Sequence, residues 1–353
     1  MARRGLHKGT YKSKEIQTEE QVRSVPFTFS PRLCDPIDAF QKPPCASAFK
    51  AFDISVSIHP VPRSGFVAVV GKPNVGKSTL LNRLVGQKLA ITSPKPQSTR
   101  DRITGILTFD DTQIVLVDTP GLIDPGLALQ HVMRGTALQA LRDADVILHL
   151  VDATEPDPAS LVELAQLNAP PAAPILVART KVDLLPEPDR EALRAVAPDV
   201  CLVSALTGEG IDALRSRLRA LLPEGPHLFP EDDISTLHLR FFAAELVRET
   251  ALEQLSDEVP HAIACAIEEF REDRDPVYIR AIIYVERESQ KRIVIGHEGS
   301  RIREIGRAAR LKIEDLLSSP VFLDLWVKVL PNWRRDQAAL RRLGYVLPEV
   351  PHS

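Results

Sequence analysis

The stretch GKPNVGKSTLLN, residues 71–82, restricts the possible fold more than any other part of this 353-residue chain. It follows the short apolar run GFVAVV (65–70), which predicts a buried strand, a loop bounded by glycines and then a helix. The backbone amides of such a loop and the N-terminus of its helix create a concave positive site for phosphates. The predicted nucleotide-binding residues of this loop are Gly71, Asn74, Val75, Gly76, Lys77, Ser78 and Thr79. The pattern by itself does not choose between ATP and GTP.

Alternating strand and helix patterns follow this loop. The runs GILTF, IVLVD, VILHLVD, ILVART and VCLVS predict strands, while LLNRLVGQ, VMRGTALQALRD and LVELAQLN predict helices. This alternation indicates an α/β domain with a mostly parallel sheet. Only DDTQ separates GILTF from IVLVD, so these two strands are expected to pair antiparallel at one edge. A last helix, IDALRSRLRALL, ends at a proline and glycine break near residues 223–226, which predicts a domain boundary.

The order of the predicted elements changes beyond that boundary. A helix (RFFAAELVRETALEQL) precedes two strands (AIACAIEEF and VYIRAIIYVER), an apolar strand-like run (IVIG), a helix (RIREIGRAARLKIEDLL) and a strand (VFLDLWVKVL). This order predicts an α+β domain with its own core. The expected organisation is a poorly ordered N-terminal extension (1–62), an α/β domain (63–225), a linker (226–235), an α+β domain (236–346) and a tail (347–353).

Composition limits the compartment and the partners. A net charge of −3 gives the whole chain no basic field, and the four widely spaced cysteines favour neither a zinc site nor a disulfide framework. No apolar run approaches the roughly 18 residues that span a bilayer. The first fourteen residues hold basic side chains and no acid, as transit peptides do, but acidic residues follow at once. A start assigned too far upstream is the alternative explanation of this extension.

Two of the loop residues and a second motif predict a site for magnesium and the terminal phosphates. Lys77 should reach the β- and γ-phosphates, and the Ser78 hydroxyl should ligate Mg²⁺. In the motif VLVDTPG, Asp118 ends a hydrophobic strand, as a carboxylate near Mg²⁺ should. Gly121 in the same motif leaves its amide free to approach a γ-phosphate.

Two more motifs, each at the end of a predicted strand, choose the base. In RTKVD (179–183), the Asp183 carboxylate can accept two hydrogen bonds from guanine. Adenine lacks that pair of donors, so ATP would leave a buried charge unpaired. In VSALTGEG, the amide of Ala205 is placed to bind the guanine carbonyl, with Ser204 and Leu206 on either side. The four motifs in this order predict a GTP site.

The segment from 65 to 222 resembles the translation-factor class of GTPases, and its whole layout is similar to the Era family. The resemblance implies that ITSPKPQSTRDRI, residues 91–103, is a switch segment in which Thr99 ligates Mg²⁺ in the GTP state. It implies a catalytic set of Lys77, Thr99 and Gly121 and a metal set of Ser78, Thr99 and Asp118. The implied guanine site consists of Thr180, Lys181, Asp183, Ser204, Ala205 and Leu206.

Three positions affect which properties of the Era family can be expected of this chain. The family usually has asparagine where this chain has Thr180; that asparagine tethers the loop and touches the base, so guanine affinity is expected to fall. Leu122, after Gly121, cannot orient a water molecule as glutamine does in some small GTPases, so intrinsic hydrolysis is expected to be slow or assisted. Asn74 stands where related enzymes help to hold an activating potassium ion.

The second domain resembles a type II KH domain through its element order and the loop Gly296-His297-Glu298-Gly299. A G-x-x-G loop lets a nucleic-acid backbone approach closely. Seven basic and two acidic residues between 291 and 312 give a local balance of 7 − 2 = +5. The family usually has lysine between the glycines, whereas Glu298 would repel phosphate. The predicted RNA-binding residues are Lys291, Arg292, Gly296, His297, Glu298, Gly299, Arg301 and Arg303.

The resemblance spans about 65–346 and implies a GTP-hydrolysing protein that uses GTP and Mg²⁺, with K⁺ as an open question. The implied partner is single-stranded RNA near the 3′ end of the small-subunit ribosomal RNA, bound during assembly of the small ribosomal subunit. The GTP state is expected to set RNA affinity. A bacterial cytoplasmic monomer is expected, with peripheral membrane contact as a family property and organellar targeting as the less favoured alternative. The rival functions are a GTPase of tRNA modification or membrane signalling, and an RNA-binding module with negligible turnover.

Overall fold

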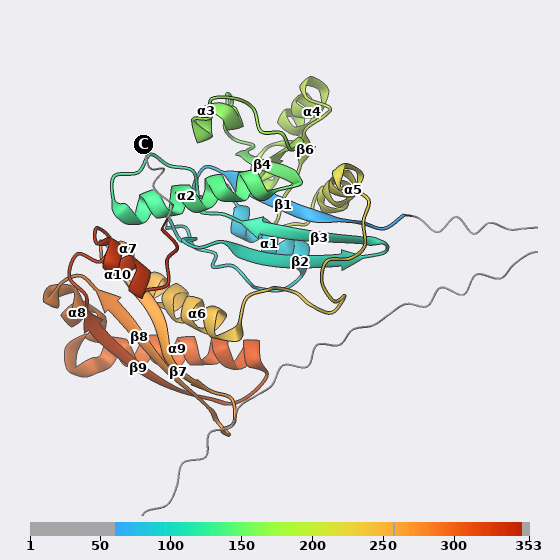
Figure 1. The fold of residues 1–353 in the computed structure, drawn as a ribbon. Coiled ribbons are helices and arrows are strands. Elements are labelled where there is room, and N and C mark those ends of the chain that lie inside the picture. The colour runs from blue at the N-terminus through green and yellow to red at the C-terminus, as the bar shows by residue number, and fades with distance from the viewer. Residues whose placement is uncertain (1–60, 96, 257, 348–353) are drawn as a thin grey trace, which may run out of the picture. The chain divides into compact units, whose positions relative to one another are not determined.

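A computed structural model describes residues 61–95, 97–256 and 258–347 (Figure 1). The predicted extension and the predicted tail therefore lie almost wholly outside the described residues. No described helix is long and apolar enough to cross a membrane.

The first domain is built on a six-stranded sheet in the order β2-β3-β1-β4-β5-β6 (Figure 1). Neighbouring strands pair in parallel except β2 and β3, which form an antiparallel hairpin at one edge. Both the mostly parallel sheet and its antiparallel edge confirm the sequence prediction. The strands are β1 (Arg63–Gly71), β2 (Ile103–Phe109), β3 (Thr112–Asp118), β4 (Val146–Asp152), β5 (Ile175–Thr180) and β6 (Cys201–Leu202).

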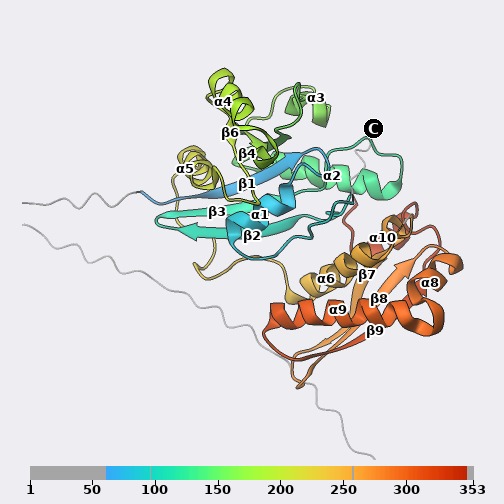
Figure 2. The ribbon, with the colours of Figure 1, turned by 180° about the vertical axis from the view of Figure 1, so that it is seen from behind.

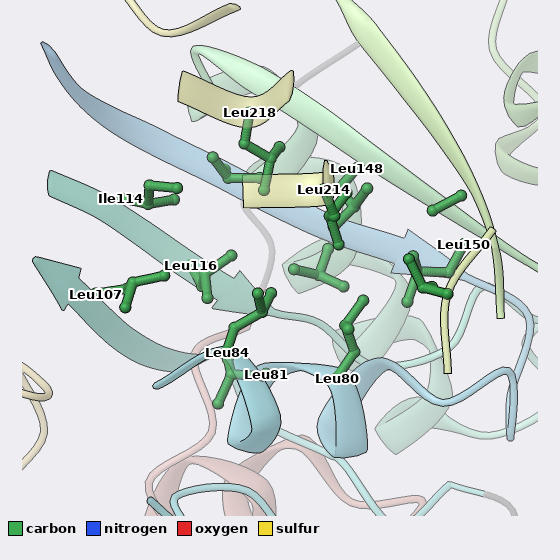
Figure 3. Close-up of a cluster of buried hydrophobic side chains, with 14 of the residues drawn as sticks. Leu80, Leu81, Leu84, Leu107, Ile114, Leu116, Leu148, Leu150, Leu214 and Leu218 are labelled. Carbon is green, nitrogen blue, oxygen red and sulfur yellow. The ribbon is translucent and has the colours of Figure 1, made fainter. Parts of the chain in front are cut away.

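Helices cover both faces of this sheet because the strands are apolar on both sides. Leucines of α1 and α5 fill one face against β2, β3 and β4 (Figure 3). Alanines and leucines of α2 and α3 fill the other face. The helices are α1 (Lys77–Val85), α2 (Ala128–Asp143), α3 (Leu161–Ala165), α4 (Glu187–Val196) and α5 (Ile211–Leu221), with a short 3₁₀ turn η1 (Val182–Leu184).

The second domain has a three-stranded sheet, β7-β8-β9, in which β7 pairs antiparallel and β9 parallel with β8. The helices α6 and α9 pack on one face of it (Figure 2). Its elements are α6 (Leu239–Gln254), α7 (Val259–Ala262), β7 (Ala264–Arg271), β8 (Val277–Val285), α8 (Glu288–Ile295), η2 (His297–Gly299), α9 (Ser300–Leu317), β9 (Val321–Val329) and α10 (Gln337–Arg342).

One predicted element of this domain is wrong. The run before the G-x-x-G loop was expected to be a strand, but residues 288–295 form helix α8. Only Gln290 and Val294 of this helix are buried, one helical turn apart, and Ile293 is 41% exposed. Along Ile293, Val294 and Ile295 the side chains are exposed, buried and half-buried, a pattern that a strand with one buried face would also show. A short apolar run therefore cannot distinguish a strand from a helix.

The segment between the domains is fastened to the edge hairpin of the first. Gln113 of β3 accepts hydrogen bonds from the amides of Leu228 (2.7 Å) and Phe229 (2.9 Å) through its Oε1. Further along, the amide of Ile106 in β2 donates to the carbonyl of Ile234 at 2.8 Å. The predicted linker, residues 226–235, thus runs along β2 and β3 and is held there.

Candidate functional site

Residues with positive φ angles shape the phosphate loop. Gly71 (φ 153°) lies so close to β4 that a Cβ there would be 2.5 Å from the carbonyl oxygen of Leu150. Gly76 (φ 99°) caps α1 in the left-handed region, and Asn74 (φ 59°) takes the same region within the loop. A backbone of this kind turns successive N–H groups, and the unpaired amides of the first helical turn, toward one concavity. The local structure expected from the sequence is therefore present.

Lys77 begins α1 with its side chain folded into this loop. Its Nζ donates to the carbonyl oxygens of Gly71 (3.3 Å) and Lys72 (2.9 Å) and is buried there. Burial lowers the pKa of Lys77 to about 8, although the Asp118 carboxylate acts in the opposite direction. A phosphate group in the loop would favour the charged ammonium, so the buried lysine suits an anionic ligand.

Three oxygen-bearing side chains lie together and fit a magnesium ion. Ser78 Oγ donates to Asp118 Oδ2 at 2.7 Å, and Thr99 Oγ1 lies 2.9 Å from Ser78 Oγ and 3.3 Å from the same Oδ2. Burial raises the pKa of the Asp118 carboxyl, against the opposing effects of Lys77 and the two hydroxyls. Asp118 Oδ1 is buried with no hydrogen-bond partner among the described residues. Hydroxyl and carboxylate oxygens around such an unpaired acceptor are ligands that Mg²⁺ prefers.

A cavity of about 350 Å³ lies between the phosphate loop and the switch segment. Gly121 lines it so closely that a Cβ there would be 2.8 Å from the backbone nitrogen of Pro73. Leu122 follows with its side chain buried in the core beside Val117, and its amide donates to the carbonyl of Gly71 at 3.2 Å. The leucine is therefore directed into the protein interior rather than into the cavity. Thr79, at the cavity rim, is exposed.

Thr180 connects the expected guanine site to the phosphate loop. Its hydroxyl donates to the carbonyl oxygen of Val75 at 2.6 Å, with the Val151 carbonyl 3.2 Å away. Lys181 takes a positive φ of 60°, lines the phosphate cavity and pairs with Asp152 at 2.7 Å. The threonine thus provides a tether between the two segments, which is the role that the resemblance ascribes to asparagine. Because Thr180 supplies this tether, guanine affinity is not expected to fall for lack of it. Only the contact that asparagine would make with the base is missing.

The two strand ends that should recognise guanine lie side by side. Asp183 is half-buried in the turn η1, and the neighbouring amide of Val182 donates to the carbonyl of Val203 at 3.4 Å. The segment 204–206 follows Val203 directly, with Ser204 buried and Leu206 exposed. No hydrogen bond to the Asp183 carboxylate is present among the described residues, so both of its oxygens are available to a ligand.

The G-x-x-G loop is a left-handed turn at the surface. Gly296 (φ 73°) and Gly299 (φ 74°) both take positive φ angles, and so does Glu298 (φ 47°) between them. A Cβ at Gly296 would be 2.8 Å from the Cβ of Arg301, so the loop needs glycine there. The Arg303 guanidinium donates to the carbonyl of Glu298 at 2.8 Å and holds the loop against α9. His297 and Glu298 are exposed at its tip.

The basic surface beside this loop is smaller than the sequence predicted. Arg310 pairs with Glu314 at 3.0 Å, and Lys312 pairs with Glu249 at 3.0 Å and Glu253 at 2.8 Å. These two residues are engaged within the protein because α9 packs on α6. Within the described part of the chain, five basic residues near the loop have no carboxylate partner: Lys291, Arg292, Arg301, Arg303 and Arg307. These five are called the loop patch below.

Sequence reasoning missed the residues of the second domain that contact the switch segment. Arg248 and Glu249 of α6 and Trp333 after β9 all lie against residues 91–103. They are more than 145 residues away along the chain, so no local pattern connects them to Thr99. The two consecutive charged residues within an otherwise amphipathic helix, both buried, were the available signal.

Comparison with known families recognises both domains. Residues 66–181 match the family described as 50S ribosome-binding GTPase. Residues 258–334 match the KH domain family. The first match covers most of the first domain's sheet but ends before β6, and the second covers the sheet and the G-x-x-G loop of the second domain.

Relatives align over almost their whole length. GTPase Era of Geobacter metallireducens is 43% identical over 295 residues, covering 80% of this chain and 98% of that protein. GTPase Era of Pseudomonas aeruginosa is 47% identical over 294 residues, with 80% and 95% covered. Two solved structures have a TM-score of 0.74 and 41% identity, covering 81% of this chain and 100% of theirs. One is a tyrosine-to-alanine variant of Aquifex aeolicus Era bound to GDP and AlF4⁻, and the other is Era with MgGDPNP and nucleotides 1506–1542 of 16S ribosomal RNA.

Proposed function

We propose a function for this chain from the premise that it belongs to the Era family of GTPases. It binds and hydrolyses GTP in the first domain, and its KH domain binds the 3′ region of the small-subunit ribosomal RNA. Through this binding it assists assembly of the small ribosomal subunit. The observation that carries the RNA part is the G-x-x-G loop with its patch of unpaired basic residues, in a chain that aligns throughout with an Era solved with 16S ribosomal RNA.

Each residue of the nucleotide site has a separate role in GTP binding and hydrolysis. The loop amides and Lys77 hold the β- and γ-phosphates, where the lysine compensates the charge that develops on the leaving group. The Gly121 amide approaches the γ-phosphate, and the absence of a side chain lets it lie against Pro73. Asp183 and the Ala205 amide select guanine. Thr180 holds this guanine site in a fixed position relative to the phosphate loop. With its side chain buried, Leu122 takes no part in orienting the attacking water.

Different residues of the site would bind its two cations. Ser78, Thr99 and Asp118 would hold magnesium, which would supply positive charge against the β- and γ-phosphates. Asn74 is the residue proposed to bind potassium. Its Nδ2 donates a hydrogen bond to the carbonyl of Pro94 at 3.0 Å. This bond fixes the side-chain amide between the phosphate loop and the switch segment and leaves Oδ1 as the atom that would ligate K⁺.

The proposed RNA site is open and its attraction is electrostatic. The loop patch can neutralise several phosphates, while the left-handed turn at Gly296 and Gly299 allows the RNA backbone to approach. Glu298 at the tip opposes this attraction, so the arginines behind the loop supply most of it. The protein is proposed to act as a cytoplasmic monomer whose contact with a membrane, if made, is peripheral.

Binding of a labelled RNA from the small-subunit 3′ end tests this proposal. The wild type is measured with GDP and with a non-hydrolysable GTP analogue, and an unrelated RNA of equal length gives the non-specific affinity. Replacing both Arg301 and Arg303 by glutamate should weaken binding of the 3′-end RNA at least tenfold, as loss of about two phosphate contacts requires. Arg310→Glu is the matched control, because Arg310 already pairs with Glu314.

The outcomes separate the rival functions. Specific binding that is lost in the double variant and kept in Arg310→Glu supports the ribosomal role. Absence of specific binding with either nucleotide removes that role and leaves a GTPase of another kind. Specific binding without measurable GTP turnover leaves a nucleotide-gated RNA-binding module.

A further inference from the structure

The switch segment is in contact with the second domain on both sides of Thr99. Before the threonine, the amide of Thr92 donates to Glu249 Oε1 at 3.3 Å, and Lys95 Nζ donates to the carbonyls of Leu252 and Leu255. These contacts attach the first half of the segment to α6. The two residues adjacent to Thr99 are held more firmly.

On the N-terminal side of Thr99, the carbonyl of Ser98 accepts a hydrogen bond from Arg248 NH2 at 2.6 Å. Arg248 lies on α6 and is almost completely buried. Its orientation is fixed by Glu245, which it contacts through two nitrogens at 2.7 and 2.5 Å. A bidentate arginine–carboxylate pair has one geometry, so the third bond to Ser98 has a defined direction.

On the C-terminal side, Arg100 extends into the second domain and is also buried. Its guanidinium donates to the carbonyls of Ile263 at 2.5 Å and His261 at 3.3 Å. It lies 5.5 Å from the ring centroid of Trp333, close enough for a cation–π interaction. The Trp333 ring is itself held by a bond from Nε1 to the carbonyl of Ala262 at 2.8 Å.

A buried guanidinium needs all of these acceptors. Transfer of an ion from water into a protein is strongly unfavourable unless hydrogen bonds and π electrons replace its hydration. The acceptors of Arg100 are in the second domain, and its own domain contributes none among the described hydrogen bonds. The conformation of the Ser98–Arg100 stretch therefore depends on the second domain, and Thr99 lies at its centre.

We propose that Arg100 and Arg248 are positioning residues for GTP hydrolysis, through which the KH domain holds Thr99 Oγ1 beside Ser78 and Asp118. The second domain then completes the nucleotide site of the first as well as binding RNA. This inference rests on the proposed function and deepens it, because it names residues that connect the nucleotide site to the RNA-binding domain. It concerns the GTP state only, since a switch threonine contributes little to a site that holds GDP.

The test compares Arg100→Lys and Arg248→Lys with Arg102→Lys in the full-length protein without RNA. Lysine keeps the charge but cannot reproduce the several directed bonds of either guanidinium. Arg102 is the matched control, because it lies in the same segment but pairs with Asp143 of the first domain at 3.2 Å. Single-turnover hydrolysis, affinity for GDP, affinity for a GTP analogue and hydrogen exchange of residues 91–103 are measured for each.

Both positioning variants should hydrolyse GTP about tenfold to a hundredfold more slowly, as expected when a catalytic group is displaced by about 1 Å. Their affinity for the GTP analogue should fall while GDP affinity stays within about twofold, and exchange of residues 91–103 should be faster. Arg102→Lys should match the wild type in all four measurements. A variant that carries both Arg100→Lys and Arg248→Lys should hydrolyse GTP only slightly more slowly than either single variant, because the two arginines hold the same stretch.

Two results overturn the proposal. One is hydrolysis at the wild-type rate in both variants. The other is an equal loss of GDP and analogue affinity, which would indicate general damage to the fold. Because no RNA is present, a failure of ribosomal RNA binding would leave this test unaffected, and the two proposals can fail separately.

Discussion

The two glycine-bounded loops of this chain precede a helix in the same way but serve opposite requirements. In the first domain, the loop that begins at Gly71 lines a cavity from Pro73 to Gly76, and Lys77 is buried beside it. In the second, Gly296 and Gly299 expose His297 and Glu298 to solvent. Chemistry on a phosphate needs an enclosed site where charges act at low dielectric constant, whereas RNA binding needs an open one that a long polymer can cross. The comparison shows that burial, rather than the glycine pattern, distinguishes the catalytic loop from the binding loop.

The largest effect is expected from removing the charge of the lysine in the phosphate loop. Lys77→Met should lower the rate of GTP hydrolysis about a hundredfold to a thousandfold, because a directed charge is lost from a buried site. Lys291→Met in the loop patch should leave hydrolysis unchanged and weaken RNA binding only. Single-turnover hydrolysis with each variant checks this, and normal turnover in Lys77→Met would contradict the assignment.

The next largest effect tests the close approach of Gly121. A methyl group there would meet the Pro73 backbone at 2.8 to 2.9 Å, so the phosphate loop must shift. Gly121→Ala should slow hydrolysis about tenfold to a hundredfold through this displacement. Gly306→Ala is the control, because a Cβ there has its nearest neighbour at 3.8 Å and should change neither hydrolysis nor RNA binding. If both variants hydrolyse GTP equally well, steric fit at Gly121 is not required.

A smaller effect concerns the tether between the guanine site and the phosphate loop. Thr180→Val keeps the shape but leaves the buried Val75 carbonyl without its donor, which costs about 1 to 3 kcal/mol. Affinity for GDP and for the GTP analogue should therefore fall together. Thr180→Asn restores the usual family residue and should bind at least as tightly as the wild type. Titration with a fluorescent guanine nucleotide measures both, and wild-type affinity in Thr180→Val would show that the tether is dispensable.

The smallest effect is expected at the tip of the exposed G-x-x-G loop. Glu298→Lys removes a repelling charge from the tip of the G-x-x-G loop and adds an attractive one. RNA should bind more tightly, and the slope of log affinity against log salt concentration should steepen by about 1. GTP hydrolysis should not change. A salt titration of RNA binding gives the answer, and an unchanged slope would place the RNA away from this loop.

The parts of the fold that depend on local patterns were predictable. The hairpin of β2 and β3 followed from the few residues between two apolar runs, and Asp118 was expected at the end of its strand. Helix α8 was mistaken for a strand because its apolar residues are few and consecutive. Contacts between distant segments were out of reach: Thr180 meets Val75 across 105 positions, and Arg100 meets Ile263 across 163. Such contacts are set by packing, which a single sequence does not display.

Coupling between the enclosed nucleotide site and the open RNA site can be measured directly. The most direct measurement is the full thermodynamic cycle: affinity for the 3′-end RNA with GDP and with the GTP analogue, and affinity for each nucleotide with and without that RNA. If the sites are coupled, the analogue tightens RNA binding relative to GDP, and RNA increases the preference for the analogue by the same factor. RNA affinity identical in the two nucleotide states, with nucleotide affinity indifferent to RNA, would contradict this coupling and leave two independent sites in one protein.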